Sequence, residues 1–145
     1  MKNYDALKLE GQLSFPLYAV SRELVKKYRP FLEKIDLTYT QYITMMVFWE
    51  NESINVKELG KRLFLDSGTL TPVLKSLESK GLVKRYRSHS DERVLLVEIT
   101  EQGKALKDKA LDIPYEISKR ISLEKDECAQ LYSLLMKFLN EFKDE

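Results

Sequence analysis

Hydrophobic residues recur with helical spacing in segment 66–81 and then fall into two short runs typical of paired strands. The apolar positions of the helical segment lie at i, i+3, i+4 and i+7, and they are Leu70, Val73, Leu74 and Leu77. Gly81 follows, where a left-handed residue commonly ends a helix. Two β-prone runs, 82–87 and 94–99, flank a polar stretch and predict a hairpin with a long loop. A helix followed by such a hairpin is typical of a winged helix-turn-helix.

Capping residues predict where two preceding helices begin. Thr38 and Gln41 have the spacing of a capping box, which opens one helix. Asn55 and Glu58 open the next helix in the same way. A short connection then leads into segment 66–81, which is the layout of a helix-turn-helix.

Prolines predict irregularities in two of the helices. An apolar stripe over 8–28 predicts a long N-terminal helix, in which Pro16 should produce a kink because it cannot donate to the carbonyl of Gln12. Pro72 favours a late start for the helix of segment 66–81, since proline is tolerated best in a first turn. The alternative caps for that start are Asp66, Ser67 and Thr69.

Two further helices are predicted after the hairpin. Thr100 caps the first, which bends or breaks near Pro114, and Ser122 caps the last. The last helix carries a wide apolar stripe formed by Leu131, Leu134, Leu135, Phe138, Leu139 and Phe142. Segments 1–37 and 101–145 are not needed to complete a winged unit over 38–100. We therefore expect them to form a homodimer interface, the alternative being that they pack on their own domain.

Composition limits the class of protein. With 145 residues, of which 43% are hydrophobic, segment 1–145 is expected to form a single, mainly α domain of the α+β class. The chain shows neither an apolar run long enough to span a membrane nor the apolar core of a signal peptide, so a cytoplasmic location is expected. A single cysteine, Cys128, and a single histidine, His89, predict no metal site and no cofactor. One histidine also leaves little scope for general acid–base catalysis, and we do not expect an enzyme.

Positive charge is concentrated around the predicted hairpin. Six Lys or Arg side chains stand against three acids between positions 75 and 93, although the whole chain has a net charge of only +1. The six are Lys75, Lys80, Lys84, Arg85, Arg87 and Arg93. A cationic helix and ribbon suit a phosphate backbone, and this predicts double-stranded DNA as a partner. The alternative interpretation is an ordinary solvated charged surface.

The segments DSGTLTPVLKSLESKGLV and SDERVLLVEIT carry a family resemblance. They are similar to the MarR family of winged-helix transcription regulators, whose wing signature is matched by Asp91, Arg93, Ile99 and Thr100. The segments LEGQLSFPLYAVSREL, KKYRPFLEKIDLTYTQY and FLDSGTLTP further resemble the organic hydroperoxide resistance regulators within that family. The resemblance implies a homodimeric repressor that binds a pseudo-palindromic operator.

The resemblance also assigns DNA-contacting positions. Ser67, Thr69 and Thr71 would lie at the major-groove end of the recognition helix. Arg93 would enter the minor groove, oriented by Asp91. The expected contacts to the phosphate backbone are Lys75, Lys84, Arg85 and Arg87.

One position departs from the family pattern. The regulators carry a sensing cysteine in a motif like Leu-Cys-Phe-x-Leu-Tyr, and here Ser14 stands in its place. A serine neither ionises near neutral pH nor forms a sulfenic acid, so direct peroxide sensing at this position should be lost. The tyrosines of the implied sensing pocket are retained, namely Tyr18, Tyr28 and Tyr39. An engineered Cys-to-Ser exchange and natural divergence both fit, and the intact tyrosines favour the first.

Other functions fit the residues less well. A regulator that responds to a non-oxidant small-molecule ligand is the alternative within the family. A winged-helix protein-interaction module should lack Arg93 and the hydroxyls at the helix end, which this chain keeps. A thiol-dependent peroxidase is excluded by Ser14, and Cys128 is expected to be a small buried hydrophobe rather than a second redox sensor.

Overall fold

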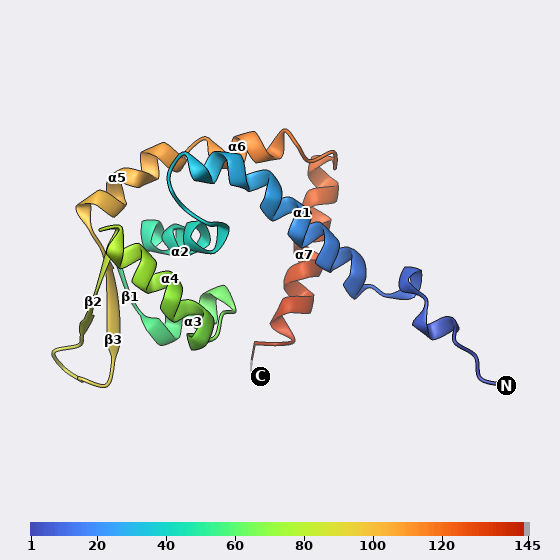
Figure 1. The fold of residues 1–145 in the computed structure, drawn as a ribbon, viewed down its shortest axis with the longest axis horizontal. Helices are drawn as coiled ribbons and strands as arrows, with labels where there is room; N and C mark the ends of the chain where they lie inside the picture. The colour runs from blue at the N-terminus through green and yellow to red at the C-terminus, as the bar shows by residue number, and fades with distance from the viewer. Residues whose placement is uncertain (144–145) are drawn as a thin grey trace.

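The computed structural model describes residues 1–143 (Figure 1). Two short 3-10 turns, Asp5–Leu7 and Leu9–Gly11, precede the first α-helix. The α-helices are α1 Ser14–Glu33, α2 Tyr39–Glu50, α3 Val56–Leu63, α4 Ser67–Ser79, α5 Glu101–Ala110, α6 Ile113–Ser118 and α7 Lys125–Asn140. The strands are β1 Ser53–Asn55, β2 Val83–Arg87 and β3 Leu95–Ile99.

The predicted winged helix-turn-helix is confirmed. The strands form an antiparallel sheet in the order β1-β3-β2, and β2 pairs with β3 from Val83 opposite Ile99 to Arg87 opposite Leu95. The loop between them projects from the body of the molecule as the wing (Figure 1). Gly81 ends α4 with a φ of 77°, as expected for a left-handed cap. Strand β1 was not predicted, because three residues are too few to show an alternating pattern.

Helix α2 lies at the centre of the core. Its Met45 and Phe48 side chains are at most 1% exposed, and leucines from α3 and α4 pack with them. Trp49 ties the far end of α2 to α5, since its Nε1 donates to the carbonyl of Gly103 at 3.0 Å. The recognition helix α4 buries Leu70, Leu74 and Leu77, which confirms the predicted apolar face. The opposite face of α4 is therefore left for solvent or a ligand.

The prediction of a kinked helix over 8–28 is wrong. Helix α1 begins at Ser14, so Pro16 lies in the first turn, where its missing N–H has no helical acceptor to lose. The carbonyl of Gln12 accepts from the N–H of Phe15 instead. Pro30 is the proline inside this helix, close to its C-terminal end.

The late start predicted for the recognition helix is also wrong. Helix α4 begins at Ser67, and Asp66 caps it by accepting from the N–H of Thr69 at 2.7 Å. Pro72 therefore lies inside the helix and leaves the carbonyl of Gly68 without its helical donor. Gly68 is exposed, so water can satisfy that carbonyl.

The predicted helix starts after the wing are partly confirmed. Thr100 caps α5 by accepting from the N–H of Gly103 at 3.0 Å, and Pro114 lies in the first turn of the separate helix α6. The predicted cap at Ser122 is wrong. Glu124 caps α7 instead, and its backbone N–H donates to Glu127 at 2.9 Å in a capping box.

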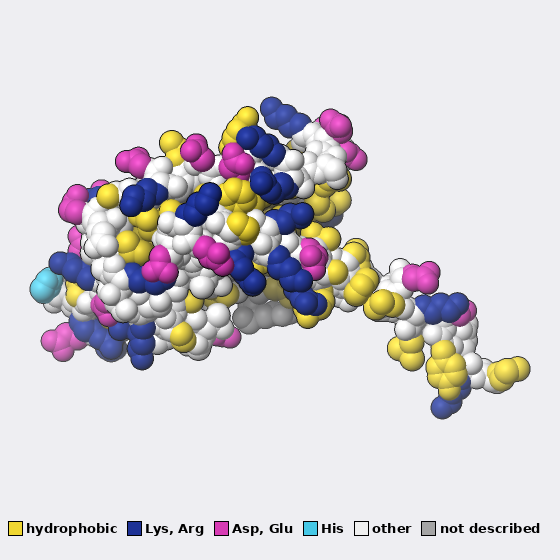
Figure 2. Space-filling model, turned by 45° about the horizontal axis from the view of Figure 1, so that its top comes forward, with side chains coloured by type: hydrophobic (Ala, Val, Ile, Leu, Met, Phe, Trp, Pro, Cys, Tyr) yellow, Lys and Arg dark blue, Asp and Glu magenta, His cyan; other side chains and the backbone are white. Residues whose placement is uncertain are grey.

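The terminal segments expose large apolar side chains. Helix α7 has no buried residue, and its predicted stripe is open to solvent, with Leu131 43% and Leu134 65% exposed. Leu13 and Tyr18, at the start of α1, are more than 60% exposed. In Figure 2 hydrophobic side chains gather where the N-terminal arm leaves the body of the molecule. Across residues 1–143, every helix is too short or too polar to cross a bilayer.

Candidate nucleic-acid interface

The N-terminal end of α4 presents short hydroxyl side chains to solvent. Ser67 and Thr69 are exposed in its first turn, directly after the Asp66 cap. Hydrogen bonds from the backbone N–H and side chain of Thr69 hold the pKa of Asp66 below its ordinary value, which keeps the carboxylate charged. Thr71 is half-buried and its Oγ1 donates to the carbonyl of Ser67 at 2.7 Å, so its hydroxyl can only accept from a further partner.

Not all the predicted backbone contacts are equally available. Lys75, Lys84 and Arg87 are exposed. Arg85 instead binds Glu78 of α4 through Nε at 3.2 Å and Nη2 at 3.0 Å, and its guanidinium-bearing side chain is 24% exposed. These hydrogen bonds hold the pKa of Glu78 below its ordinary value. Arg85 therefore joins the base of the wing to the recognition helix.

The wing loop carries a highly exposed arginine close to the start of β3. The side chain of Arg93 is 91% exposed. Asp91 accepts from its backbone N–H and from its Nε, both at 3.1 Å, and these bonds hold the pKa of Asp91 below its ordinary value. The loop is closed at its base, where the N–H of Ser88 donates to the carbonyl of Val94 at 2.9 Å. The structure thus presents Arg93 as an oriented, accessible cation.

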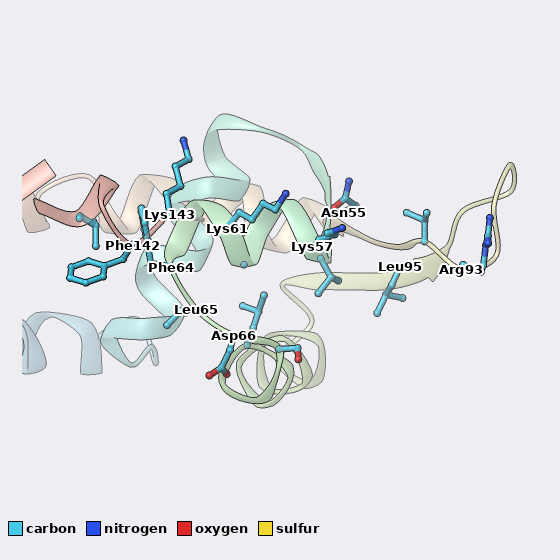
Figure 3. Close-up of a pocket in the computed structure, with 16 residues that line it drawn as sticks. Asn55, Lys57, Lys61, Phe64, Leu65, Asp66, Arg93, Leu95, Phe142 and Lys143 are labelled. Atoms are coloured by element: carbon cyan, nitrogen blue, oxygen red, sulfur yellow. The ribbon is translucent and has the colours of Figure 1, made fainter. Parts of the chain in front are cut away.

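Two cations that sequence reasoning missed lie beside these groups. Lys57 and Lys61 of α3 line a groove of about 960 Å³ that also reaches Arg93 and the first residues of α4 (Figure 3). Phe64 lies on the same groove and ends α3 in the left-handed conformation, with a φ of 55°. The signal for the lysines was present in the sequence, because their i, i+4 spacing places both on one helix face.

The four residues of the implied sensing pocket do not come together within one chain. Tyr28 and Tyr39 are in contact, with ring centroids 5.0 Å apart. Ser14 lies fourteen residues before Tyr28 on the same helix, which corresponds to about 21 Å along the axis. Tyr18 lies near the Ser14 end of α1 and is 62% exposed. A single protomer therefore holds two separate halves of the pocket.

Tyr42 completes a cluster that the sequence did not reveal. Its ring centroid lies 5.8 Å from that of Tyr28 and 6.2 Å from that of Tyr39. Burial raises the pKa of all three phenols, that of Tyr42 to about 12. The phenols stay protonated at neutral pH and further into the alkaline range than free tyrosine, and each hydroxyl can donate a hydrogen bond to an anionic group.

Cys128 is not the buried side chain that the sequence predicted. It is half-buried on α7, and its sulfur lies 3.9 Å from the carbonyl oxygen of Leu123. Its exposure follows from the exposure of the whole helix. Within residues 1–143, no three His, Cys, Asp or Glu side chains lie together in a way that could hold a metal ion.

Comparison with known proteins identifies the family. The model of the transcriptional regulator SarA/Rot family matches residues 25–110, which include the helix-turn-helix and the wing. This chain belongs to the SarA/Rot family. A SarA/Rot protein is a transcriptional regulator, and the expectation that the chain is not an enzyme is confirmed.

Individual relatives cover nearly the whole chain. The organic hydroperoxide resistance transcriptional regulator of Bacillus subtilis is 48% identical over 94% of this chain and 92% of its own. The HTH-type transcriptional regulator SarZ of Staphylococcus aureus is 43% identical over 92% of this chain and 90% of its own. A structure of reduced AbfR bound to DNA is 33% identical with a TM-score of 0.78, covering 95% of this chain and 96% of that one. The predicted MarR-type winged-helix fold is therefore confirmed for this SarA/Rot regulator.

Proposed function

We propose that this SarA/Rot regulator is a homodimeric repressor that binds a pseudo-palindromic operator in double-stranded DNA and belongs to the organic-hydroperoxide response. The observation that carries the proposal is the pairing of a free recognition-helix end with an oriented wing arginine. The 48% identity to a regulator of organic hydroperoxide resistance supports a role in the organic-hydroperoxide response. The similarity to AbfR, whose structure was determined bound to DNA, supports DNA as the ligand. A repressor of this kind acts where the genome lies, in the cytoplasm.

The two elements read DNA by different chemistry. Ser67 and Thr69 offer hydroxyls at a helix N-terminus, where base edges and phosphates can both be bound. Arg93 suits the negative potential of a narrow, A·T-rich minor groove. The exposed lysine and arginine side chains of α4 and β2 neutralise phosphates and set the salt dependence of binding.

The exposed apolar side chains of the terminal helices form the dimer interface. Helix α7 and the first turns of α1 bury almost nothing within the protomer, and a second copy covers them by two-fold symmetry. The same symmetry sets two recognition helices about 34–36 Å apart along the duplex. Helix α7 and the first turns of α1 thus form the dimer, whereas Leu32 of α1, Ala110 of α5 and Ile117 of α6 pack in the protomer's own core. Segment 38–100 reads the DNA.

The dimer also completes the sensing pocket. Because Ser14 and the Tyr28–Tyr39 contact lie far apart in one protomer, Ser14 of one protomer meets the tyrosines of its partner. Protonated phenols there would hold a thiolate, and a serine hydroxyl offers no such anion. The chain as it stands is therefore insensitive to peroxide at this position. The family alternative, a regulator that responds to a non-oxidant ligand, is less well supported, because the relative at 48% identity is a regulator of organic hydroperoxide resistance.

A selection experiment tests the DNA-binding function directly. The purified chain is incubated with a library of random duplexes of about 40 base pairs, which spans more than two successive major-groove half-sites. We expect enrichment of one sequence with two-fold symmetry and half-sites one helical turn apart. A pool that remains unselected after repeated rounds would rule out sequence-specific binding.

A further inference from the structure

One buried polar side chain, Gln41, lies between the first turn of α2 and the recognition helix. It is 7% exposed, and its amide takes part in three hydrogen bonds. The Nε2 donates to Ser76 Oγ at 2.9 Å, while the Oε1 accepts from Lys80 Nζ at 3.0 Å and from the backbone N–H of Thr38 at 3.1 Å. Thr44, the other buried polar residue among those described, bonds only within its own helix, to Thr40. Gln41 is thus a polar link between two elements.

The link holds one face of α4. Ser76 and Lys80 are four residues apart, so their side chains are neighbours on the helix surface. Lys80 also donates to the backbone carbonyl of Asp36, in the turn between α1 and α2, where Asp36 has a φ of 55°. The C-terminal turn of the recognition helix is therefore fixed to the start of α2, while its N-terminal turn remains free for DNA.

The same turn of α2 carries two of the three clustered tyrosines. Tyr39 and Tyr42 flank Gln41 along the chain, and both rings lie within 6 Å of the Tyr28 ring centroid. A displacement of Tyr39 also displaces the Gln41 amide, because both belong to the first turn of one helix. The amide cannot move away from Ser76 and Lys80 without leaving buried polar groups unpaired.

We propose that Gln41 is a positioning residue that sets the orientation of the recognition helix relative to the cluster of Tyr28, Tyr39 and Tyr42, and so couples that cluster to sequence reading. The proposal rests on the DNA-binding function proposed above. Gln41 does not touch DNA. It acts through Ser76 and Lys80 on the angle at which Ser67 and Thr69 meet the bases.

The variants Gln41→Met and Gln41→Glu separate positioning from simple packing. Methionine keeps the length of the side chain but loses the hydrogen bonds to Ser76, Lys80 and Thr38. Glutamate can still accept from Lys80 Nζ and from the backbone N–H of Thr38, and its carboxylate can accept a hydrogen bond from the Ser76 hydroxyl. Fluorescence anisotropy measures affinity for the duplex that the wild-type chain enriches and for an unselected duplex of equal length. We expect Gln41→Met to reduce the ratio of the two affinities about tenfold and Gln41→Glu to restore most of it.

Trp49→Phe is the matched control. It removes one hydrogen bond from the other end of α2, to Gly103 of α5, and keeps an aromatic ring beside Tyr42, whose ring centroid lies 6.4 Å from that of Trp49. Its thermal midpoint should fall while its affinity ratio stays at the wild-type value. An unchanged ratio in Gln41→Met, or an equal fall in Trp49→Phe, overturns the positioning role. A wild-type chain that enriches no duplex overturns the DNA-binding function instead, and the two failures are distinct.

A double-mutant cycle tests the coupling to the tyrosines. Tyr28→Leu disturbs the ring contacts with Tyr39 and Tyr42 and should lower the affinity ratio in the wild-type background. In the Gln41→Met background the same change should have little further effect, because the link is already lost. Additive effects of Tyr28→Leu and Gln41→Met, or no effect of Tyr28→Leu alone, would overturn the coupling.

Discussion

The carboxylate of Asp91 accepts hydrogen bonds from both the backbone N–H and the Nε of Arg93, each at 3.1 Å. The Nε bond and a longer one from Nη2, at 3.4 Å, restrict the rotamers of an arginine side chain that is otherwise 91% exposed. Restricting the side chain before binding lowers the entropy that must be lost when it enters a groove. The wing is therefore organised for contact before it meets DNA.

Removal of this arginine should affect sequence preference. We expect Arg93→Ala to weaken binding to the selected duplex by about 1–3 kcal/mol and to relax preference at flanking A·T-rich positions. Anisotropy titrations on duplexes that differ only at those positions measure both effects. Asp91→Asn, which weakens the orienting bonds and leaves the arginine, should produce a smaller loss of the same kind.

Lys84→Ala is the comparison for Arg93→Ala. Lys84 is exposed on β2, and in the proposed mode of DNA binding it contacts a phosphate rather than a base. Its loss should weaken all duplexes alike and reduce the slope of log K against log salt by about 1. Identical, sequence-independent losses in Lys84→Ala and Arg93→Ala would mean that the wing does not read DNA.

The exposed stripe of α7 predicts a dimer that a single charge can disrupt. Leu135 is 38% exposed in the protomer, so Leu135→Glu should leave the fold of the protomer intact. In the dimer the same carboxylate would be buried without a partner, which is strongly unfavourable. Sedimentation equilibrium should show a wild-type dimer and a Leu135→Glu monomer at micromolar concentration.

Ser133→Glu is the control for this prediction, since Ser133 lies on the opposite side of α7 from the stripe. It adds the same charge and should remain dimeric. A wild-type monomer, or equal dissociation of both variants, would contradict the assignment of α7 to the interface.

The cap of the recognition helix should make stability depend on pH. Hydrogen bonds from Thr69 hold the pKa of Asp66 below its ordinary value, so the charged cap stabilises the folded state above the carboxyl pKa of the unfolded chain. That contribution is lost as pH falls through the lowered pKa of the folded state. Asp66→Asn keeps the acceptor but not the charge.

Denaturant titrations between about pH 2 and pH 7 should therefore show a stability difference between wild type and Asp66→Asn that is largest near neutral pH and shrinks in acid. A difference that is constant across this range would mean that the carboxylate charge has no part in capping α4.

Position 14 should decide the response to peroxide. Because Ser14 has no oxidisable sulfur, the wild-type chain should bind the selected duplex equally well before and after treatment with an organic hydroperoxide. Ser14→Cys should release DNA on treatment, while mass spectrometry reports oxidation of residue 14. Release by the wild-type chain would place the sensor elsewhere, with Cys128 the first residue to test.

Local signals made much of the fold predictable. The caps at Thr38, Asn55 and Thr100 and the left-handed Gly81 act within a few residues of chain, and all four are found in the structure. The kink predicted at Pro16 was wrong because the effect of a proline depends on where the helix begins. An apolar stripe does not define the first residue of a helix.

The candidate site was predictable only in part. The positions of Asp91 and Arg93 follow from a motif of adjacent residues, and the structure brings them together as expected. The ion pair of Arg85 with Glu78 and the hydrogen bond of Gln41 to Ser76 each join two different elements. Hydrophobic periodicity and capping motifs describe single elements, so they cannot predict such contacts. Ser14 and Tyr28 are far apart because one unbroken helix, α1, contains both residues. The sequence motif around Ser14 did not predict that the helix is continuous between them.

The central claim, sequence-specific binding by a dimeric SarA/Rot regulator, is tested most directly by one ratio. Fluorescence anisotropy at about 150 mM salt gives the affinity of the wild-type chain for its selected duplex and for an unselected duplex of equal length. We predict a ratio of about 1,000 or more, with one dimer bound per selected duplex. A ratio near one, at any stoichiometry, would contradict the account.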